Sequence, residues 1–170
     1  VLFRSASEYG NTFLSRPYID WQDKTQSARW FEKLKQLWQD KDLLIVEGVT
    51  SRSGVGNDLF DNAHSIKRII CPARDAYSYI EQIQQAIIQH AENRLILLML
   101  GPTAKVLAYN LSELGYRAID IGHIDSEYEW FKMGATEKVR FIHKHTADFN
   151  EDGIKLEDDA VYEQQIICRI

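Results

Sequence analysis

The chain of 170 residues is poor in cysteine and proline and contains no long apolar run. Its two cysteines, Cys71 and Cys168, are too few for the disulfide framework of a small secreted domain, so we expect two reduced, buried thiols. The longest apolar run, Leu95–Leu100, is far shorter than the roughly 20 residues that span a bilayer. The first residues lack the charged-then-apolar order of a signal peptide. We therefore predict a cytoplasmic protein without a transmembrane segment.

Basic residues are also scarce relative to acidic ones. Lys and Arg number 20 against 25 Asp and Glu, a net charge of -5, and a nucleic-acid partner would require a basic face to neutralise its phosphates. We therefore expect no nucleic-acid partner. No Gly/Ser-rich or Pro-rich linker divides the chain, so we predict a single domain over residues 1–170. The chain opens at Val1 instead of Met, and we expect that a preceding segment of this domain is missing.

Short apolar runs alternate with longer amphipathic segments, a pattern typical of repeated strand–helix units. Such units connect by right-handed crossovers into a parallel sheet. We therefore predict an α/β fold with a Rossmann-like parallel sheet flanked by helices, in which ligands bind beyond the carboxyl ends of the strands. The predicted strands are 42–46, 66–71, 94–100 and 118–121, and the predicted helices are 21–38, 77–91, 103–115 and 126–134.

A polar, glycine-rich loop over residues 47–58 follows the first predicted strand directly. Glycines allow close backbone approach to a ligand, and the Arg52 guanidinium matches phosphate oxygens. Thr103 begins a predicted helix, where free N–H groups favour an anion, and we expect it to be the N-cap. A nucleotide diphosphate therefore fits these segments. The alternatives are a glycine-rich turn with solvated charges and an ordinary helix cap.

The densest cluster of reactive side chains lies at residues 120–130, after the last predicted strand. Asp125 and Glu127 are candidate ligands for Mg²⁺ or Mn²⁺, which prefer oxygen. The candidate general bases are His123, Glu129 and Asp125. The alternative is that these acids only complement the helix dipole. The remaining histidines, including His143 and His145, lack metal-ligand spacing with any cysteine and are interpreted as surface or loop residues.

Distinctive motifs occur, in this order, at Asn11–Tyr18, Val46–Phe60, Arg68–Pro72, Leu100–Ala104 and Ile119–Phe131. Together they resemble the GT-D family of bacterial glycosyltransferases. This resemblance implies a GT-D-type fold and a metal-dependent transfer of a hexose, typically glucose, from a UDP-sugar to a saccharide or an already glycosylated protein. The donor and a glycan or glycoprotein acceptor would be its partners, and a Mn²⁺ or Mg²⁺ ion its cofactor.

The resemblance also implies a role for individual residues. The metal and catalytic site would contain His123, Asp125, Glu127 and Glu129, and Asp125-Ser126-Glu127 has the Asp-x-Glu form of the family's metal motif. Longer relatives carry an upstream Arg-Phe-Gly-Asp-Gly-Glu-like segment with a second Asp-x-Glu, which is absent here, so either pair is open as the metal site. The nucleotide-sugar site would contain Glu47, Ser51, Arg52, Gly54, Gly56 and Asn57, with Thr103 at the neighbouring helix.

Two other functions stay open from the sequence. A non-catalytic nucleotide-sugar-binding or assembly module would keep the fold without turnover, and another nucleotide-dependent α/β transferase would use the same loops. The second is disfavoured because no P-loop or dinucleotide fingerprint occurs. The sequence leaves the acceptor, the stereochemical outcome and a homo-oligomeric state open.

Overall fold

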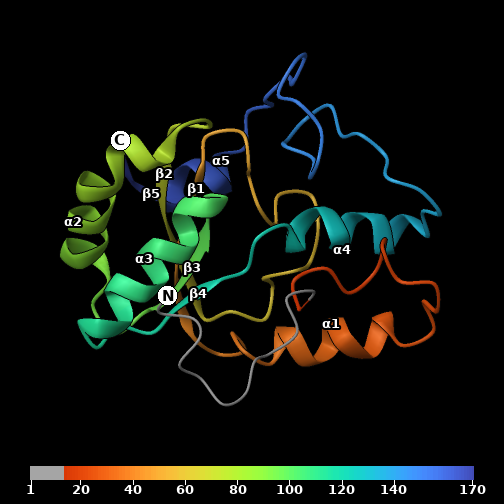
Figure 1. The fold of residues 1–170 in the computed structure, drawn as a ribbon, viewed down its shortest axis with the longest axis horizontal. Helices are drawn as coiled ribbons and strands as arrows, with labels where there is room; N and C mark the ends of the chain where they lie inside the picture. Colours follow the sequence, from red (N-terminus) through yellow and green to blue (C-terminus); the bar gives the residue numbers. More distant parts are fainter. Residues whose placement is uncertain (1–13) are drawn as a thin grey trace, which may run out of the picture.

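A computed structural model describes residues 14–170, so the first three residues of the motif Asn11–Tyr18 lie outside the described residues. Five parallel strands form one sheet in the order β4-β3-β1-β2-β5, with helices on both faces (Figure 1). The α/β fold with a parallel sheet is thus confirmed. The elements are α1 (Ser27–Lys35), β1 (Asp42–Gly48), β2 (Ser65–Cys71), η2 (Ala76–Tyr79), α2 (Ile80–His90), β3 (Leu95–Met99), α3 (Pro102–Glu113), β4 (Ala118–Asp120), α4 (Ile124–Met133), α5 (Ala160–Gln165) and β5 (Ile166–Arg169).

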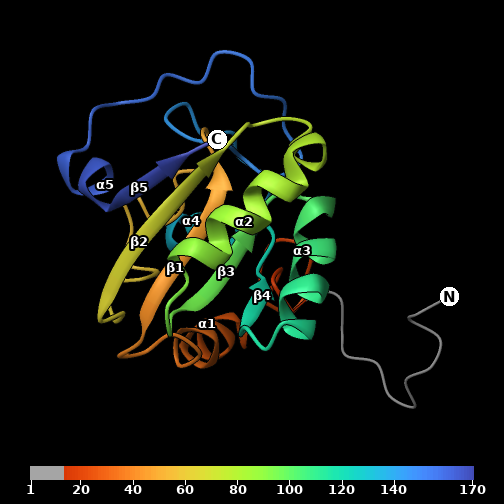
Figure 2. The same ribbon diagram turned by 90° about the vertical axis from the view of Figure 1, so that its left-hand side faces the viewer.

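The sheet is buried on both faces because apolar residues make up Leu43–Val46 of β1 and all of β3. In β1, Leu43 and Ile45 face one core cluster, while Leu44 and Val46 face the other. This alternation follows from the two-residue period of a strand. Helices α2 and α3 cover the second face (Figure 2), and α1 and α4 pack on the first. Continuous apolar runs of this kind are typical of parallel strands.

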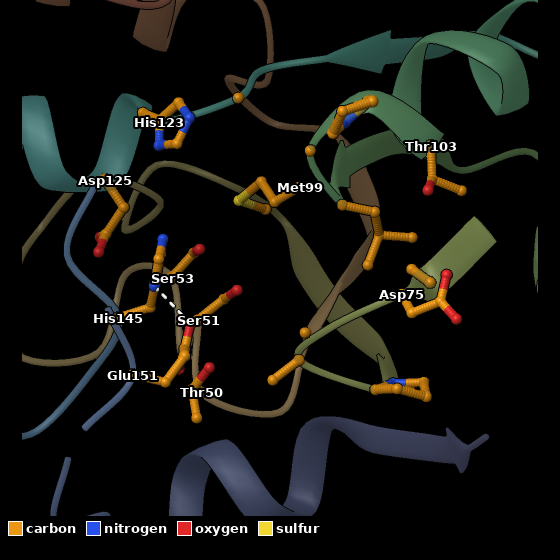
Figure 3. Close-up of a pocket in the computed structure, with 18 of the residues that line it drawn as sticks. Thr50, Ser51, Ser53, Asp75, Met99, Thr103, His123, Asp125, His145 and Glu151 are labelled. Carbon is orange, nitrogen blue, oxygen red and sulfur yellow. Dashed lines mark ion pairs between the residues drawn. The ribbon is translucent and has the colours of Figure 1, made fainter. Parts of the chain in front are cut away.

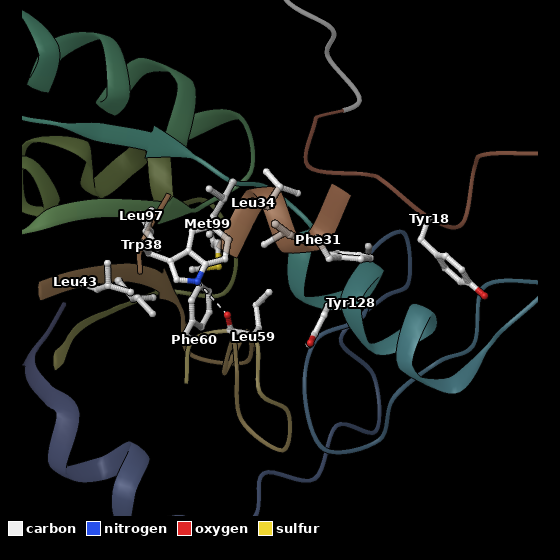
Figure 4. Close-up of a cluster of buried hydrophobic side chains, with 14 of the residues drawn as sticks. Tyr18, Phe31, Leu34, Trp38, Leu43, Leu59, Phe60, Leu97, Met99 and Tyr128 are labelled. Atoms are coloured by element: carbon white, nitrogen blue, oxygen red, sulfur yellow. Dashed lines mark hydrogen bonds between the residues drawn. The ribbon is translucent and has the colours of Figure 1, made fainter. Parts of the chain in front are cut away.

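The first core cluster is rich in aromatic side chains (Figure 4). Trp38 is fully buried, and its indole Nε1 donates a hydrogen bond to the Leu59 carbonyl oxygen at 3.0 Å. Phe31 of α1 packs edge-on against Tyr128 of α4, with 4.9 Å between ring centroids. These contacts fix α4, and with it the residues that approach the strand ends.

Several predicted boundaries differ from the structure. Helix α1 begins at Ser27 instead of Trp21, and α3 begins at Pro102 with Gly101 as its cap, so Thr103 is not the N-cap. Proline at the first helical position has no N–H to leave unpaired, which explains the earlier start. Helix α5 and strand β5 were not predicted. Within residues 14–170, no helix is both long and apolar enough to cross a bilayer.

Candidate active site at the carboxyl ends of the strands

A cavity of about 410 Å³ lies where the carboxyl ends of the strands meet (Figure 3). Its lining comes from segments following β1, β2, β3 and β4, and from the long segment between α4 and α5. Parallel strands place their carboxyl ends at one edge, so segments distant in the sequence converge there. The volume lies within the range of about 300–1,000 Å³ that is typical of ligand pockets.

The amino-terminal end of α3 borders this cavity. Gly101 adopts a φ of 53°, a conformation that favours glycine. It turns the chain from β3 directly into the helix, and Thr103 in the first turn also lines the cavity. Free N–H groups and the helix dipole favour an anion at such an end. One wall of the cavity is therefore suited to a phosphate group.

Two histidines line the opposite part of the cavity. The His145 Nδ1 atom lies 2.7 Å from Glu151 Oε1, and the rings of His145 and His123 are 6.4 Å apart. Burial is the largest influence on the pKa of His123, which lies below its ordinary value, so this imidazole is neutral at pH 7 and able to accept a proton. The His145 ring has a carboxylate partner within hydrogen-bonding distance.

Asp125 anchors the glycine-rich loop to α4. Its Oδ1 accepts hydrogen bonds from Gly54 N at 2.8 Å and from Asn57 Nδ2 at 3.0 Å. Asn57 also donates to Glu129 Oε1 at 2.8 Å. A Cβ on Gly54 would lie 2.6 Å from a Phe60 ring carbon, and its φ is 81°. Glycine is therefore required here by both space and conformation.

Lys144 is the cation of this network, and sequence reasoning missed it. Its side chain is fully buried, with Nζ 2.9 Å from Asp125 Oδ2 and 2.6 Å from Glu129 Oε1. It also donates to the Val55 carbonyl oxygen at 2.9 Å. One ammonium thus joins α4, the glycine-rich loop and the segment after α4, and forms ion pairs with two acids beside the cavity.

Glu127 faces away from Asp125. Its Oε2 accepts hydrogen bonds from Tyr18 N at 3.0 Å and Ile19 N at 2.9 Å, and burial raises its pKa against the effect of these donors. Positions two apart on a helix point in different directions, so the structure does not bring this pair together as ligands of one ion. Among residues 14–170, no group of three or more His, Cys, Asp or Glu side chains is placed to hold a metal ion.

Glu47 and Arg52 belong to a second buried network, next to the cavity wall. Glu47 Oε1 lies 2.6 Å from Arg68 Nη1 and accepts from the Tyr162 hydroxyl at 3.2 Å, while Oε2 accepts from Ser53 N at 2.8 Å. The guanidinium carbon of Arg52 lies 4.6 Å from the centre of the Tyr162 ring. The backbone φ of Arg52 is 44°, which is unusual for a residue other than glycine. The stacking of its guanidinium on Tyr162 stabilises this conformation.

The predicted site residues thus separate into two groups. His123, Asp125, Ser51 and Thr103 line the cavity. The others lie beside or behind it: Glu47, Arg52, Gly54, Gly56, Asn57, Glu127 and Glu129. Their roles in donor, metal and catalytic chemistry stay predictions. His145 and Glu151 also line the cavity, and the sequence offered no signal for them beyond their residue types.

Comparison with known proteins agrees with this architecture. Residues 2–149 match the family described as "Glycosyltransferase GT-D fold". The chain is 69% identical over 163 residues to "Probable glycosyl transferase Gly" of Streptococcus gordonii, covering 95% of this chain and 24% of that protein. It is 62% identical over 167 residues to "Glycosyltransferase GlyD" of Streptococcus pneumoniae serotype 4, covering 98% of this chain and 20% of that protein. The chain therefore spans about a quarter or less of these curated relatives.

Two solved structures share the fold. One, described as "A New Glycosyltransferase (DUF1792) from Streptococcus sanguinis", has a TM-score of 0.94 and 68% identity over 95% of this chain and 61% of that chain. The other is described as "The highly conserved domain of unknown function 1792 has a distinct glycosyltransferase fold". It has a TM-score of 0.95 and 60% identity, and the match covers 97% of this chain and 60% of that chain. The family match covers residues 2–149, and two glycosyltransferase-fold structures share the fold of this parallel sheet. The chain therefore belongs to the GT-D glycosyltransferase fold family.

Proposed function

We propose that the protein containing this chain is a glycosyltransferase that moves a hexose, glucose in the first instance, from a UDP-sugar to a saccharide or glycosylated protein. The observation that carries this function is the cavity of about 410 Å³ at the strand ends of a GT-D-family chain. Its wall at α3 suits the diphosphate, and its opposite wall carries two imidazoles. Both relatives are named as glycosyltransferases.

In this function the diphosphate lies against the start of α3, near Thr103 and Ser51. The sugar then extends toward His123 and His145, which lie across the cavity from α3 (Figure 3). Negative charge develops on the departing diphosphate as the glycosidic bond breaks. Oriented N–H groups at a helix start stabilise such charge without reorganisation.

His145 is the proposed base that removes the proton of the acceptor hydroxyl. Glu151, whose Oε1 lies 2.7 Å from His145 Nδ1, orients the ring and faces the positive charge that forms when the ring takes the proton. His123 has no such partner within the part of the chain that the structure describes, and it is the second candidate. Glu129 is held by Lys144 and Asn57, so we assign it to positioning the loop instead of proton transfer.

A divalent cation, Mn²⁺ or Mg²⁺, belongs to the same proposal. Asp125 faces Lys144 and the loop, and Glu127 faces two backbone N–H groups. The described residues therefore do not fit a metal held jointly by this pair. A cation bound with the donor would neutralise charge on the diphosphate.

Calorimetric titration of UDP-glucose into the full-length protein, with Mn²⁺ and with chelator, tests the donor assignment. We expect UDP-glucose to bind the wild type. The affinity should fall at least about ten-fold in Ser51→Tyr, because the larger side chain fills the cavity. Ser112→Tyr, on the exposed end of α3, should bind like the wild type. Glu127→Gln keeps an oxygen acceptor for both N–H groups and should bind within about two-fold. Binding unaffected by Ser51→Tyr would contradict the location, and no binding of any UDP-sugar would contradict the function.

Replacing His145 by glutamine should lower kcat by about 10²–10⁴-fold, the usual contribution of a positioned general base. Donor affinity should stay within about three-fold, because glutamine keeps a polar side chain of similar reach. The matched control is His143→Gln, two residues away and outside the cavity lining. A larger loss in His123→Gln than in His145→Gln, measured as initial rates of sugar transfer, would move the base to His123.

A further inference from the structure

A second hollow of about 640 Å³ lies between α2 and α3, on the face of the sheet opposite α1 and α4. Tyr77, Glu81 and Gln85 succeed one another at four-residue spacing from η2 into α2, so they share one side of this groove. Val106 and Asn110 have the same spacing on α3 and form the other side. Asn110 Nδ2 donates to Gln84 Oε1 at 2.9 Å, which ties the two walls together.

The groove borders the cavity at the strand ends. Tyr77 lines both hollows, and its side chain is 60% exposed. An aromatic ring this exposed has little role in packing the domain, since a buried ring would contribute far more apolar area. A ligand extending out of the cavity past Tyr77 would therefore enter the groove between the helices.

The groove's chemistry suits a neutral polyhydroxylated chain. Among residues 14–170, the polar groups that line it are mostly the amides of Gln82, Gln84, Gln85 and Asn110, with a single carboxylate and no cation. An amide offers a donor and an acceptor together, which matches neighbouring hydroxyl groups that each need both. The face of Tyr77 gives the C–H side of a sugar ring an apolar platform. The absence of Lys and Arg from this lining disfavours a polyphosphate or nucleic acid.

We propose that the α2–α3 groove binds the glycan of the acceptor, with Tyr77 at the junction where the acceptor's terminal sugar meets the donor. This inference rests on the proposed transferase function, because it uses the cavity as the place of transfer. It assigns the acceptor's specificity to α2 and α3, and the donor and the base to the strand-end loops.

The test is saturation-transfer NMR of the full-length protein with neutral oligosaccharides of the cello, malto and chito series, without donor. We expect binding to at least one series. The affinity should fall about ten-fold or more in Tyr77→Ala and about three-fold or more in Gln85→Ala. Tyr109→Ala is the matched control, because Tyr109 is 45% exposed on α3 but outside the groove lining. In transfer assays the KM for the bound oligosaccharide should rise in Gln85→Ala while the Kd for UDP-glucose is unchanged.

The outcomes separate this inference from the function on which it rests. If UDP-glucose binds but no oligosaccharide does, or if Tyr77→Ala and Gln85→Ala bind like Tyr109→Ala, the groove assignment is overturned. If the variants lose oligosaccharide binding while no UDP-sugar binds, the groove stands and the transferase function is overturned. Binding of an unglycosylated peptide of the acceptor protein in preference to every oligosaccharide would also overturn the glycan assignment.

Discussion

Replacing Lys144 by methionine should lower the free energy of unfolding by about 3–5 kcal/mol, the cost of leaving a buried charge without its partner. Methionine keeps much of the volume but removes the ammonium that lies 2.9 Å from Asp125 and 2.6 Å from Glu129. The two carboxylates would then face each other beside the cavity without a cation. Thermal unfolding followed by circular dichroism should show a midpoint lowered by about 6–20 °C.

The control for this prediction neutralises the acids as well. A triple variant with Lys144→Met, Asp125→Asn and Glu129→Gln should recover part of the loss, because neutral amides no longer repel each other. It keeps acceptors for Gly54 N and Asn57. A midpoint within about 2 °C of the wild type in the single variant would show that water or rearrangement compensates the acids, contrary to a buried ion network.

Glu47→Leu should also lower the free energy of unfolding by about 3–5 kcal/mol, because it leaves the buried Arg68 guanidinium without its carboxylate partner. The side chains of Glu47 and Arg68 are 0% and 3% exposed. The same change leaves Ser53 N and the Tyr162 hydroxyl without their acceptor. Each such loss adds to the penalty for an unpaired buried polar group. Urea unfolding monitored by tryptophan fluorescence measures the change.

A surface pair of the same type is the contrast. Arg169 and Glu163 lie 2.6 Å apart, but their side chains are 52% and 53% exposed. Water and salt screen this pair, so Arg169→Ala should change stability by no more than about 1 kcal/mol. Glu47→Gln keeps an acceptor oxygen and should fall between the two. Equal effects of Glu47→Leu and Arg169→Ala would contradict the importance assigned to burial.

Much of the sheet could be predicted because its strands are encoded locally. The apolar runs at β1 and β3 are buried on both faces, and a run of this kind has few alternatives in a chain of this length. Strand β5 was missed because its four residues are only partly buried and end in Arg169. It is defined by pairing with β2, a contact that no local pattern announces.

The site was only partly predictable, for a related reason. The Asp-x-Glu spacing of Asp125 and Glu127 suggested that both acids bind one metal ion. On a helix, however, side chains four residues apart are neighbours, and Asp125 and Glu129 converge on Lys144. His145 and Glu151 lie in a segment without regular secondary structure. Only tertiary contacts, such as the hydrogen bond from His145 N to the Thr50 carbonyl oxygen at 2.7 Å, bring them to the cavity.

The pairing of β5 with β2 also has a consequence for the order of assembly. Tyr162, just before β5, bonds to a residue 115 positions earlier in the chain. During synthesis the strands β1 to β4 emerge well before β5, so Glu47 and Arg68 are made before the tyrosine that covers them. Contacts of such long sequence separation form slowly. Docking of the C-terminal strand is therefore expected to be a late step of folding, during which the edge of β2 is open to association with other chains.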